Sequence, residues 1–220
     1  MKELNLMYIT GFGLYGTECV RRLQELGYKW NVLNSKDNYL AIVLADFSGK
    51  DIGDDLKAFL LFTKSFSHVD PILIDVTPDG NISHPVEGFY SYLYIKSVRP
   101  FDVVRNFINL YDEGIVHHGI VSLDLADLLD TIKGRKLLTI EIYPFREMLS
   151  GEIAKEIPLI PNKGEGVIYL QTSQKEEKQF KKELVTLKGL LEKDDGQFVV
   201  HWGFNFSREH YLCVMITTDI

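Results

Sequence analysis

The sequence predicts an α/β fold in three parts: a Rossmann-like, mostly parallel sheet, a central helix, and an α+β domain with a four-stranded sheet and two helices. In residues 1–100, short apolar runs alternate with segments of helical periodicity, a pattern typical of a parallel sheet covered on both faces. Residues 101–133 have the spacing of two helices joined by a connector, and residues 134–220 return to strands. We therefore expect two separate sheets, one on each side of the central helix.

Composition narrows the class of protein. The chain has 220 residues, of which 45% are hydrophobic and 25% charged, as in an ordinary globular protein. A net charge of -7 argues against a nucleic-acid-binding surface. Neither a signal peptide nor a membrane span is visible, so we expect a cytoplasmic protein. Cys19 and Cys213 lie in apolar segments and are interpreted as reduced, buried thiols.

The first hundred residues give the strands and helices of the expected parallel sheet. An apolar run at 4–10 predicts one buried strand, and Gly27 is placed to end the helix that follows it. The uninterrupted apolar run at 39–46 is typical of a central parallel strand. Further strands are predicted at 29–33, 72–76 and 89–98, and a further helix at 54–66.

A glycine-rich turn, Gly11-Phe12-Gly13-Leu14-Tyr15-Gly16, stands between the first strand and the first helix. Glycines let the backbone approach an anion, and a helix start presents free N–H groups, so this turn is a candidate phosphate cradle. A dinucleotide site would also need an acid about 20 residues further on, at a strand end. Asp37, the nearest acid, lies beyond the expected strand end, which argues against a dinucleotide site. Besides the phosphate cradle and the dinucleotide site, a third interpretation is a simple tight turn between strand and helix.

The central helix is predicted from one apolar stripe. Phe101, Val104, Ile108, Tyr111 and Ile115 recur at spacings of three and four, and Gly114 is placed near the end of the helix to stop it. In the second helix Ser122 is the expected N-cap, with Asp124 in the first turn and Asp127 one turn later. These two acids suit the positive end of a helix, and a carboxylate there can also orient a water as a general base.

The last part of the chain should be strand, helix, strand, helix and two strands. Strands are predicted at 136–143, 166–172, 197–204 and 211–217, and helices at 145–156 and after Ser173. We expect the last two strands to form a hairpin. His117 and His118 are adjacent, and side chains of neighbouring residues in an extended chain point apart, so no metal site is expected.

Three stretches carry a resemblance to the tubulin/FtsZ superfamily. Residues 119–127, GIVSLDLAD, are similar to the loop and helix start that read close to GLINLDFAD in FtsZ proteins. FDVVRNFINLYDEGI, before that loop, resembles the FtsZ central helix, and QFVVHWGFNFSREHYLCVMITTDI resembles the family's last strands. The resemblance covers most of the chain and implies an FtsZ/tubulin-like fold. It also implies that Asp124 and Asp127 would act on the nucleotide of the next subunit in a filament.

The resemblance implies nucleotide-binding positions, but the residues there depart from the family pattern. Leu14 and Tyr15 stand where the family has glycine, and Glu18 and Asp51 add negative charge. Arg105, a donor-only side chain, takes the place of a guanine-reading Asn or Asp, with Asn106 beside it. We therefore expect a degenerate nucleotide site. Its candidate residues are Gly11, Gly13, Gly16, Gly49, Lys50, Gly53, Arg105 and Asn106.

Taken together, these features predict a protein that acts through protein–protein association, without efficient GTP hydrolysis. It would be a filament subunit or a regulator, self-associating or binding another tubulin/FtsZ-like protein, with no cofactor and no metal. One alternative is a GTP-hydrolysing cytoskeletal filament protein that uses GTP and Mg²⁺, with Asp124 and Asp127 as catalytic residues. Another is a Rossmann-like protein that binds a small ligand or a dinucleotide.

Overall fold

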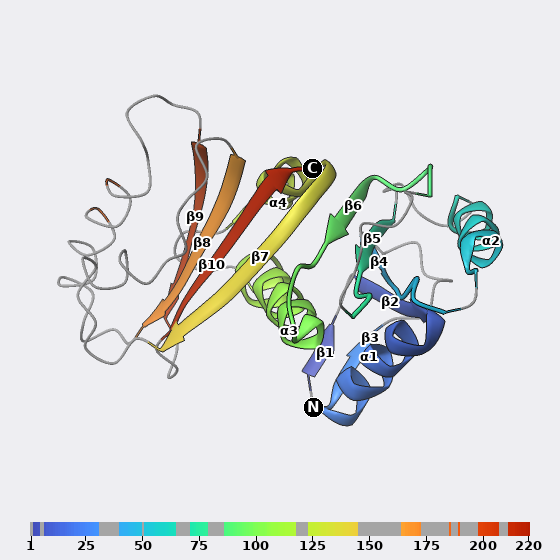
Figure 1. Cartoon of the computed structure of the whole chain (residues 1–220). Helices are drawn as coiled ribbons and strands as arrows, with labels where there is room; N and C mark the ends of the chain where they lie inside the picture. Colours follow the sequence, from blue (N-terminus) through green and yellow to red (C-terminus); the bar gives the residue numbers. More distant parts are fainter. Residues whose placement is uncertain are drawn as a thin grey trace. The chain divides into compact units, whose positions relative to one another are not determined.

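The computed structural model describes residues 2–4, 7–30, 40–49, 51–64, 71–78, 86–117, 123–144, 164–172, 185, 189, 198–206 and 211–220. The chain forms two compact units (Figure 1). Unit 1 comprises residues 1–105 and 132–138 with residue 220, and unit 2 comprises residues 106–131 and 139–219. Two helices and one strand therefore contribute residues to both units.

Unit 1 contains the predicted parallel sheet. Strands β2 (Met7–Phe12), β4 (Leu40–Ala45), β5 (Ile72–Asp75) and β6 (Ser91–Tyr94) pair in parallel, and the first residues of β7 (Gly134–Pro144) join them. Every residue of β4, β5 and β6 is buried, as their uninterrupted apolar runs indicate.

The first predicted strand is divided in two. In place of one strand over 4–10, β1 (Lys2–Leu4) pairs with β3 (Tyr28–Trp30) in a separate two-stranded sheet, and β2 begins at Met7. The prediction of a single strand was therefore wrong, because an apolar run does not reveal a change of pairing partner.

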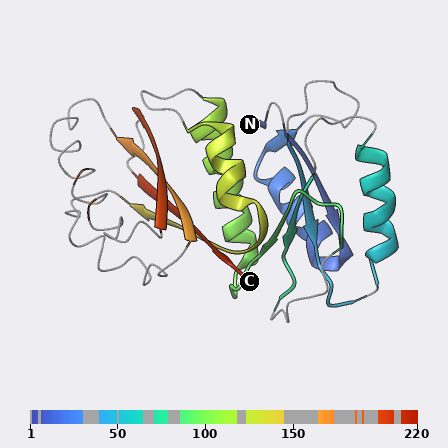
Figure 2. The ribbon, with the colours of Figure 1, turned by 90° about the horizontal axis from the view of Figure 1, so that it is seen from above.

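Helices α1 (Gly13–Glu25) and α2 (Gly53–Thr63) cover opposite faces of this sheet (Figure 2). Leu56 and Phe59 of α2 pack against Val43 of β4 and Leu73 of β5. Neighbouring strand residues alternate between faces, so the other face is left to α1. The helix ends before Gly27, which takes a left-handed φ of 86° as the sequence predicts.

Helix α3 (Pro100–Tyr111) buries four residues of the predicted stripe, Phe101, Val104, Ile108 and Tyr111, whereas Ile115 lies beyond the helix and is half-buried. The predicted glycine stop was wrong, because the chain continues past Tyr111 in a π-helical turn, η1 (Asp112–Val116). Gly114 has no left-handed φ and instead makes room for neighbours: a Cβ there would lie 3.0 Å from Leu123 Cδ1.

Unit 2 contains α4 (Leu125–Ile132) except for its last residue, and the strands β8 (Gly164–Thr172), β9 (Phe198–Phe206) and β10 (Tyr211–Asp219). β10 runs antiparallel to β8, and β9 runs parallel to β8 at the edge of the sheet. The predicted hairpin of the last two strands was therefore wrong, since β8 lies between them. The order β7-β10-β8-β9 does give the predicted four-stranded sheet.

A single strand order, β2-β4-β5-β6-β7-β10-β8-β9, corrects the expectation of two separate sheets. The physical reason is the length of β7, which has 11 residues. Its residues Gly134 to Leu137 pair with β6 in unit 1, and the strand then continues into unit 2. The helices predicted at 145–156 and after Ser173, together with His118, lie outside the described residues.

Both cysteines are free and buried, as predicted. Burial raises the pKa of the Cys19 thiol to about 12 and also raises the pKa of Cys213, so both are protonated at neutral pH. Within the part of the chain that the structure describes, no helix is both long and apolar enough to cross a membrane.

Candidate functional site

The turn between β2 and α1 is built tightly against the end of β4. Gly13 has a φ of 75°, and a Cβ there would lie 2.3 Å from the Asp46 carbonyl oxygen. Only glycine fits such a position. The helix has no cap of its own, because its N-cap is Phe12 and its first turn contains no acid. Its first N–H groups therefore need an acceptor from another part of the chain.

Asp46, directly after β4, supplies that acceptor. Its Oδ2 accepts the Tyr15 amide N–H at 2.8 Å, and its Oδ1 accepts the Ser48 amide at 3.0 Å and the Ser48 hydroxyl at 2.6 Å. The Asp46 amide in turn donates to the Phe12 carbonyl at 2.9 Å. The residue is only 3% exposed, so a buried carboxylate occupies the N-terminus of α1, where negative charge is favoured.

The Asp46 carboxylate is held in its ionised form. Burial by itself would raise its pKa, but the hydrogen bonds from the Ser48 hydroxyl and from the amides of Tyr15 and Ser48 outweigh burial. The pKa of Asp46 therefore lies below its ordinary value, and the turn contains a fixed negative charge at neutral pH.

The ends of β4 and β5 are hydrogen-bonded to each other in the same way. The Phe47 amide donates to Thr77 Oγ1 at 2.9 Å, and the Thr77 amide donates to Asp75 Oδ1 at 3.0 Å. The Tyr92 hydroxyl completes the chain by donating to Asp75 Oδ2 at 2.7 Å. The polar groups at the carboxyl ends of β4 and β5 thus have partners within the chain, one of which is Tyr92 of β6.

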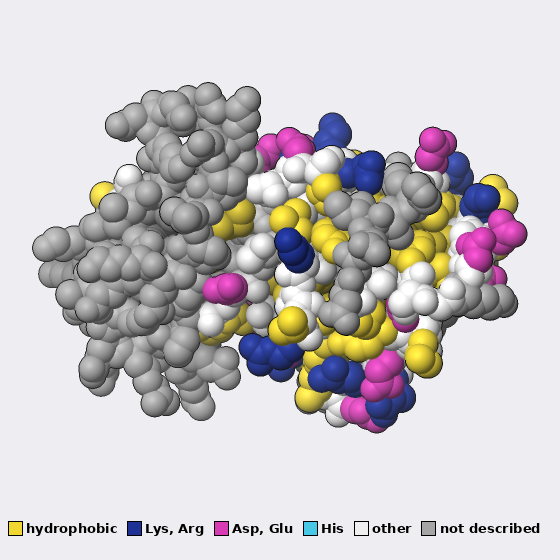
Figure 3. Space-filling model, viewed as in Figure 1, with side chains coloured by type: hydrophobic (Ala, Val, Ile, Leu, Met, Phe, Trp, Pro, Cys, Tyr) yellow, Lys and Arg dark blue, Asp and Glu magenta, His cyan; other side chains and the backbone are white. Residues whose placement is uncertain are grey.

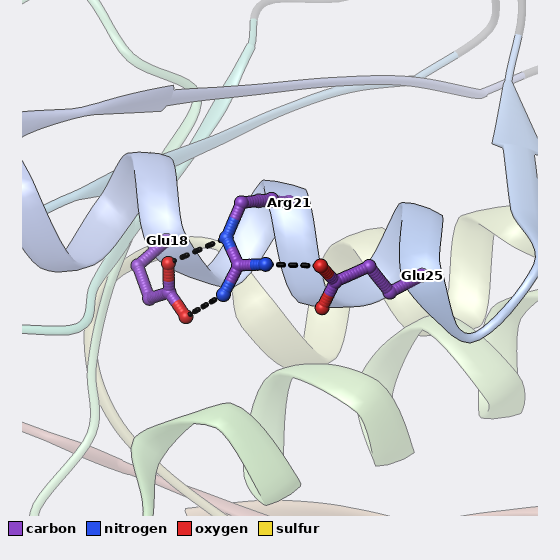
Figure 4. Close-up of polar contacts among 3 residues, drawn as sticks. All are labelled: Glu18, Arg21 and Glu25. Atoms are coloured by element: carbon purple, nitrogen blue, oxygen red, sulfur yellow. Dashed lines mark hydrogen bonds and ion pairs between the residues drawn. The ribbon is translucent and has the colours of Figure 1, made fainter.

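The exposed face of α1 carries a separate charge network. Arg21 bridges Glu18 and Glu25, with its Nε 2.8 Å from Glu18 Oε2 (Figure 4). Basic and acidic side chains lie side by side on this face of the molecule (Figure 3). Leu14, near the start of the helix, is 88% exposed. Exposed ion pairs contribute little to stability, so this face is a solvated surface with one protruding apolar side chain.

In unit 2, both candidate catalytic acids contact other groups of the chain. Asp124 Oδ1 accepts the Ala126 amide at 3.0 Å and so caps α4. Asp127 Oδ1 lies 3.3 Å from Nδ1 of His201, on β9. The expected N-cap, Ser122, lies outside the described residues.

Leu123 fixes the start of this acid-bearing segment. Its amide donates to the Gly114 carbonyl at 3.2 Å, and its side chain is 2% exposed. A Cβ on Gly203 of β9 would lie 2.7 Å from Leu123 Cγ and 2.8 Å from the Tyr169 ring. Two glycines, one on η1 and one on β9, therefore make room for this leucine.

Glu113 joins η1 to the strands of unit 2. Its Oε2 accepts the side-chain amide of Gln171 at 2.9 Å and the hydroxyl of Tyr211, and its carbonyl accepts the Tyr169 hydroxyl at 2.7 Å. Burial raises the pKa of Tyr169, so the hydroxyl remains a donor at neutral pH. This network holds η1, and with it the Leu123 contact, against β8 and β10.

Only the comparison of structures finds proteins that are similar to this chain. No family model matches the chain, and no curated protein matches it. TubZ from Bacillus thuringiensis serovar israelensis, in a GTPγS-form protofilament, is 12% identical with a TM-score of 0.55, over 94% of this chain and 66% of that one. CetZ2 from Haloferax volcanii, a GTPγS-bound protofilament, is 10% identical with a TM-score of 0.53, over 92% and 69% of the two chains.

The chain has a tubulin/FtsZ-like fold. This agrees with the fold class predicted from the sequence. Because the sequence identities are only 10% and 12%, these matches show the fold and nothing further. The chain spans 61% of the length of CetZ from Methanosaeta thermophila and 64% of FtsZ from M. jannaschii.

Within this tubulin/FtsZ-like fold, only part of the predicted nucleotide-binding set comes together. Gly11, Gly13 and Gly16 form one tight turn: a Cβ on Gly11 would lie 2.4 Å from the Gly16 carbonyl oxygen. Gly49 lies in an exposed bend, and Gly53 is the first residue of α2. Lys50 lies outside the described residues.

The two candidates on α3 have different surroundings. Arg105 lies 3.5 Å from Asp102 on its own helix. Asn106 Oδ1 is buried and has no hydrogen-bond partner among the residues that the structure describes. Sequence reasoning missed Asp46, Leu123 and Glu113. The only sequence signal for Asp46 is an acid that directly follows a buried strand.

Proposed function

We propose that this tubulin/FtsZ-like chain acts in the cytoplasm through protein–protein association, as a filament subunit or as a regulator of a tubulin-like filament, without efficient GTP hydrolysis. One observation carries the proposal: an amide in the first turn of α1 and two amides directly after β4 donate to the chain's own side chains. The Tyr15 and Ser48 amides donate to Asp46, and the Phe47 amide donates to Thr77.

These groups do not fit a phosphate. A phosphate at a helix N-terminus needs free N–H donors, and here the Tyr15 amide already has a charged acceptor. A second anion would also meet the buried negative charge of Asp46, and like charges at about 4 Å repel by several kcal/mol at a partly buried site. No step of GTP hydrolysis is therefore assigned to this chain.

The roles of the two acids support the same proposal. Asp124 uses one oxygen to cap α4, and Asp127 faces His201. Neither contact prepares a carboxylate to take a proton from water. Both side chains are nevertheless partly or fully exposed, so they are available to a partner surface.

Proteins of the same fold that form filaments support the proposal of association. The TubZ and CetZ2 chains with this fold are recorded as protofilaments. A head-to-tail contact of this kind does not close on itself, so it produces open assemblies. The exposed Leu14 supplies apolar surface on the glycine-turn side, and Asp124 supplies charge on the other unit.

Sedimentation with and without GTP and Mg²⁺ tests the proposal. We expect any assembly to be independent of nucleotide and to be weakened severalfold when Asp124→Ala is combined with Asp127→Ala. Asp130→Ala is the matched control, because Asp130 is an exposed acid on the same helix. Assembly that appears only with GTP would favour the GTP-hydrolysing alternative. A monomer that also binds no tubulin-like partner would reject the proposal.

A further inference from the structure

The β2–α1 turn contains the carboxylate of Asp46, which belongs to the chain itself. The hydrogen bond from the Tyr15 amide to Asp46 joins positions 31 residues apart, so it is not a local turn contact. The carboxylate has three donors within 3.0 Å, from Tyr15 and from Ser48. One donor belongs to the first turn of α1 and two belong to Ser48 after β4, so the carboxylate accepts hydrogen bonds at the helix N-terminus as an inorganic anion would.

We propose that Asp46 is the specificity-determining residue of this turn: its carboxylate takes the place of a bound phosphate and closes the turn to anionic ligands. The inference rests on the proposed function, which assigns no nucleotide to the turn, and it names the single residue responsible. It makes the shape of the turn independent of any ligand, because the group that holds the helix start in place is part of the chain.

The other acids near the turn make different contacts. Glu18 is bound to Arg21 on the exposed face of α1, and Asp51 accepts the Gly53 amide at 2.9 Å at the start of α2. Among the acids that the structure describes, Asp46 alone accepts an amide from the first turn of α1. Removing Asp46 should therefore free the Tyr15 donor, whereas removing Asp51 should not.

The substitution Asp46→Ala should convert a closed turn into an open one. It leaves the amides of Tyr15 and Ser48 without their acceptor and leaves a space the size of a carboxylate at the positive end of α1. An inorganic anion of suitable size then has donors to bind and no fixed negative charge to oppose it.

Thermal unfolding at increasing pyrophosphate concentration, with ionic strength held constant by NaCl, tests the proposal. We expect Asp46→Ala to lower the Tm by about 4–8 °C, as for loss of a buried charged acceptor in a chain of this size. Pyrophosphate should then raise the Tm of this variant in a saturable way. Wild type and the matched control Asp51→Ala should show no such rise.

Equal stabilisation of all three proteins by pyrophosphate, or no stabilisation of Asp46→Ala, would overturn the proposal. A second measurement needs no substitution and covers the case in which the variant does not fold. In wild type, the Tyr15 amide NMR signal should follow the titration of a carboxylate and should not move with pyrophosphate. An amide signal that moves with pyrophosphate at neutral pH also overturns it. Neither readout involves assembly, so failure here is distinct from failure of the sedimentation test.

Discussion

At the scale of single residues, the β2–α1 turn depends on two positions that touch each other. Gly13 has a left-handed φ and lies against the Asp46 backbone, and the Asp46 carboxylate caps the helix that Gly13 begins. A substitution at either residue therefore affects the position of the other. The GxGxxG pattern predicts a tight strand-to-helix turn, but it cannot show that a side chain from the next parallel strand fills it.

Substitution of Gly13 by alanine should be strongly destabilising. A Cβ at this position would be 2.3 Å from the Asp46 carbonyl oxygen, on a backbone with φ of 75°. We expect a loss of about 2–4 kcal/mol in the free energy of unfolding, measured by denaturant titration. Gly49→Ala is the matched control, because nothing lies within 4 Å of its Cβ position, and it should change stability by less than about 0.5 kcal/mol. Equal effects of the two substitutions would contradict the described turn.

The ionised state of Asp46 makes a prediction about pH. Its pKa is lowered in the folded protein, so the folded state binds fewer protons than the unfolded state as the pH falls. Its stabilising contribution is complete above the ordinary aspartate pKa of about 4 and is lost as the pH falls toward the lower folded value. Asp46→Asn should therefore cost about 1–3 kcal/mol at pH 7 and less near pH 3. Parallel stability curves for the two proteins would show that Asp46 is not held ionised in the fold.

At the scale of elements, helix starts were predicted less well than helix faces. The stripe of α3 is clear in the sequence, since it follows from the period of the helix alone. The cap of α4 was expected at Ser122, whereas Asp124 makes the hydrogen bond to the Ala126 amide. Two capping residues within three positions cannot be distinguished by type, because both Ser and Asp are favoured at N-caps.

The two roles open to Asp124 can be separated by a pair of substitutions. Asp124→Ala removes the cap and should cost about 1 kcal/mol in the free energy of unfolding, whereas Asp124→Asn retains a capping oxygen and should cost less than about 0.5 kcal/mol. If Asp124 contributes its charge to assembly, both variants should sediment less than wild type. A loss of assembly in Asp124→Ala alone would mean that the cap, and not the charge, is what assembly requires.

At the scale of the whole molecule, the order of elements was predictable and the pairing of distant strands was not. The alternation of apolar runs and helices indicates a parallel sheet, and the pattern after Gly134 indicates a four-stranded sheet. β10 nevertheless pairs with β8 and not with its sequence neighbour β9. Short-range patterns give the strands themselves, but pairing is decided by packing between segments far apart in the chain.

The candidate site likewise has features that the sequence predicts and features that it does not. The glycine turn and the acid pair Asp124 and Asp127 are visible as local motifs. Asp46 and the Glu113 network are not visible, because Tyr15 lies 31 positions from Asp46 and the partners of Glu113 lie 56 or more positions away. A resemblance in the motifs thus indicates the fold, while the long-range partners of those motifs decide what the turn can bind.

Calorimetric titration of purified wild-type protein with GTP and with GDP, in the presence of Mg²⁺, tests the central claim most directly. The carboxylate of Asp46 already accepts the Tyr15 amide at the start of α1, so we expect no binding of either nucleotide below about 1 mM, which corresponds to a binding free energy weaker than about -4 kcal/mol. Micromolar or tighter binding of GTP or GDP would contradict the claim that the turn is closed by the protein's own side chain.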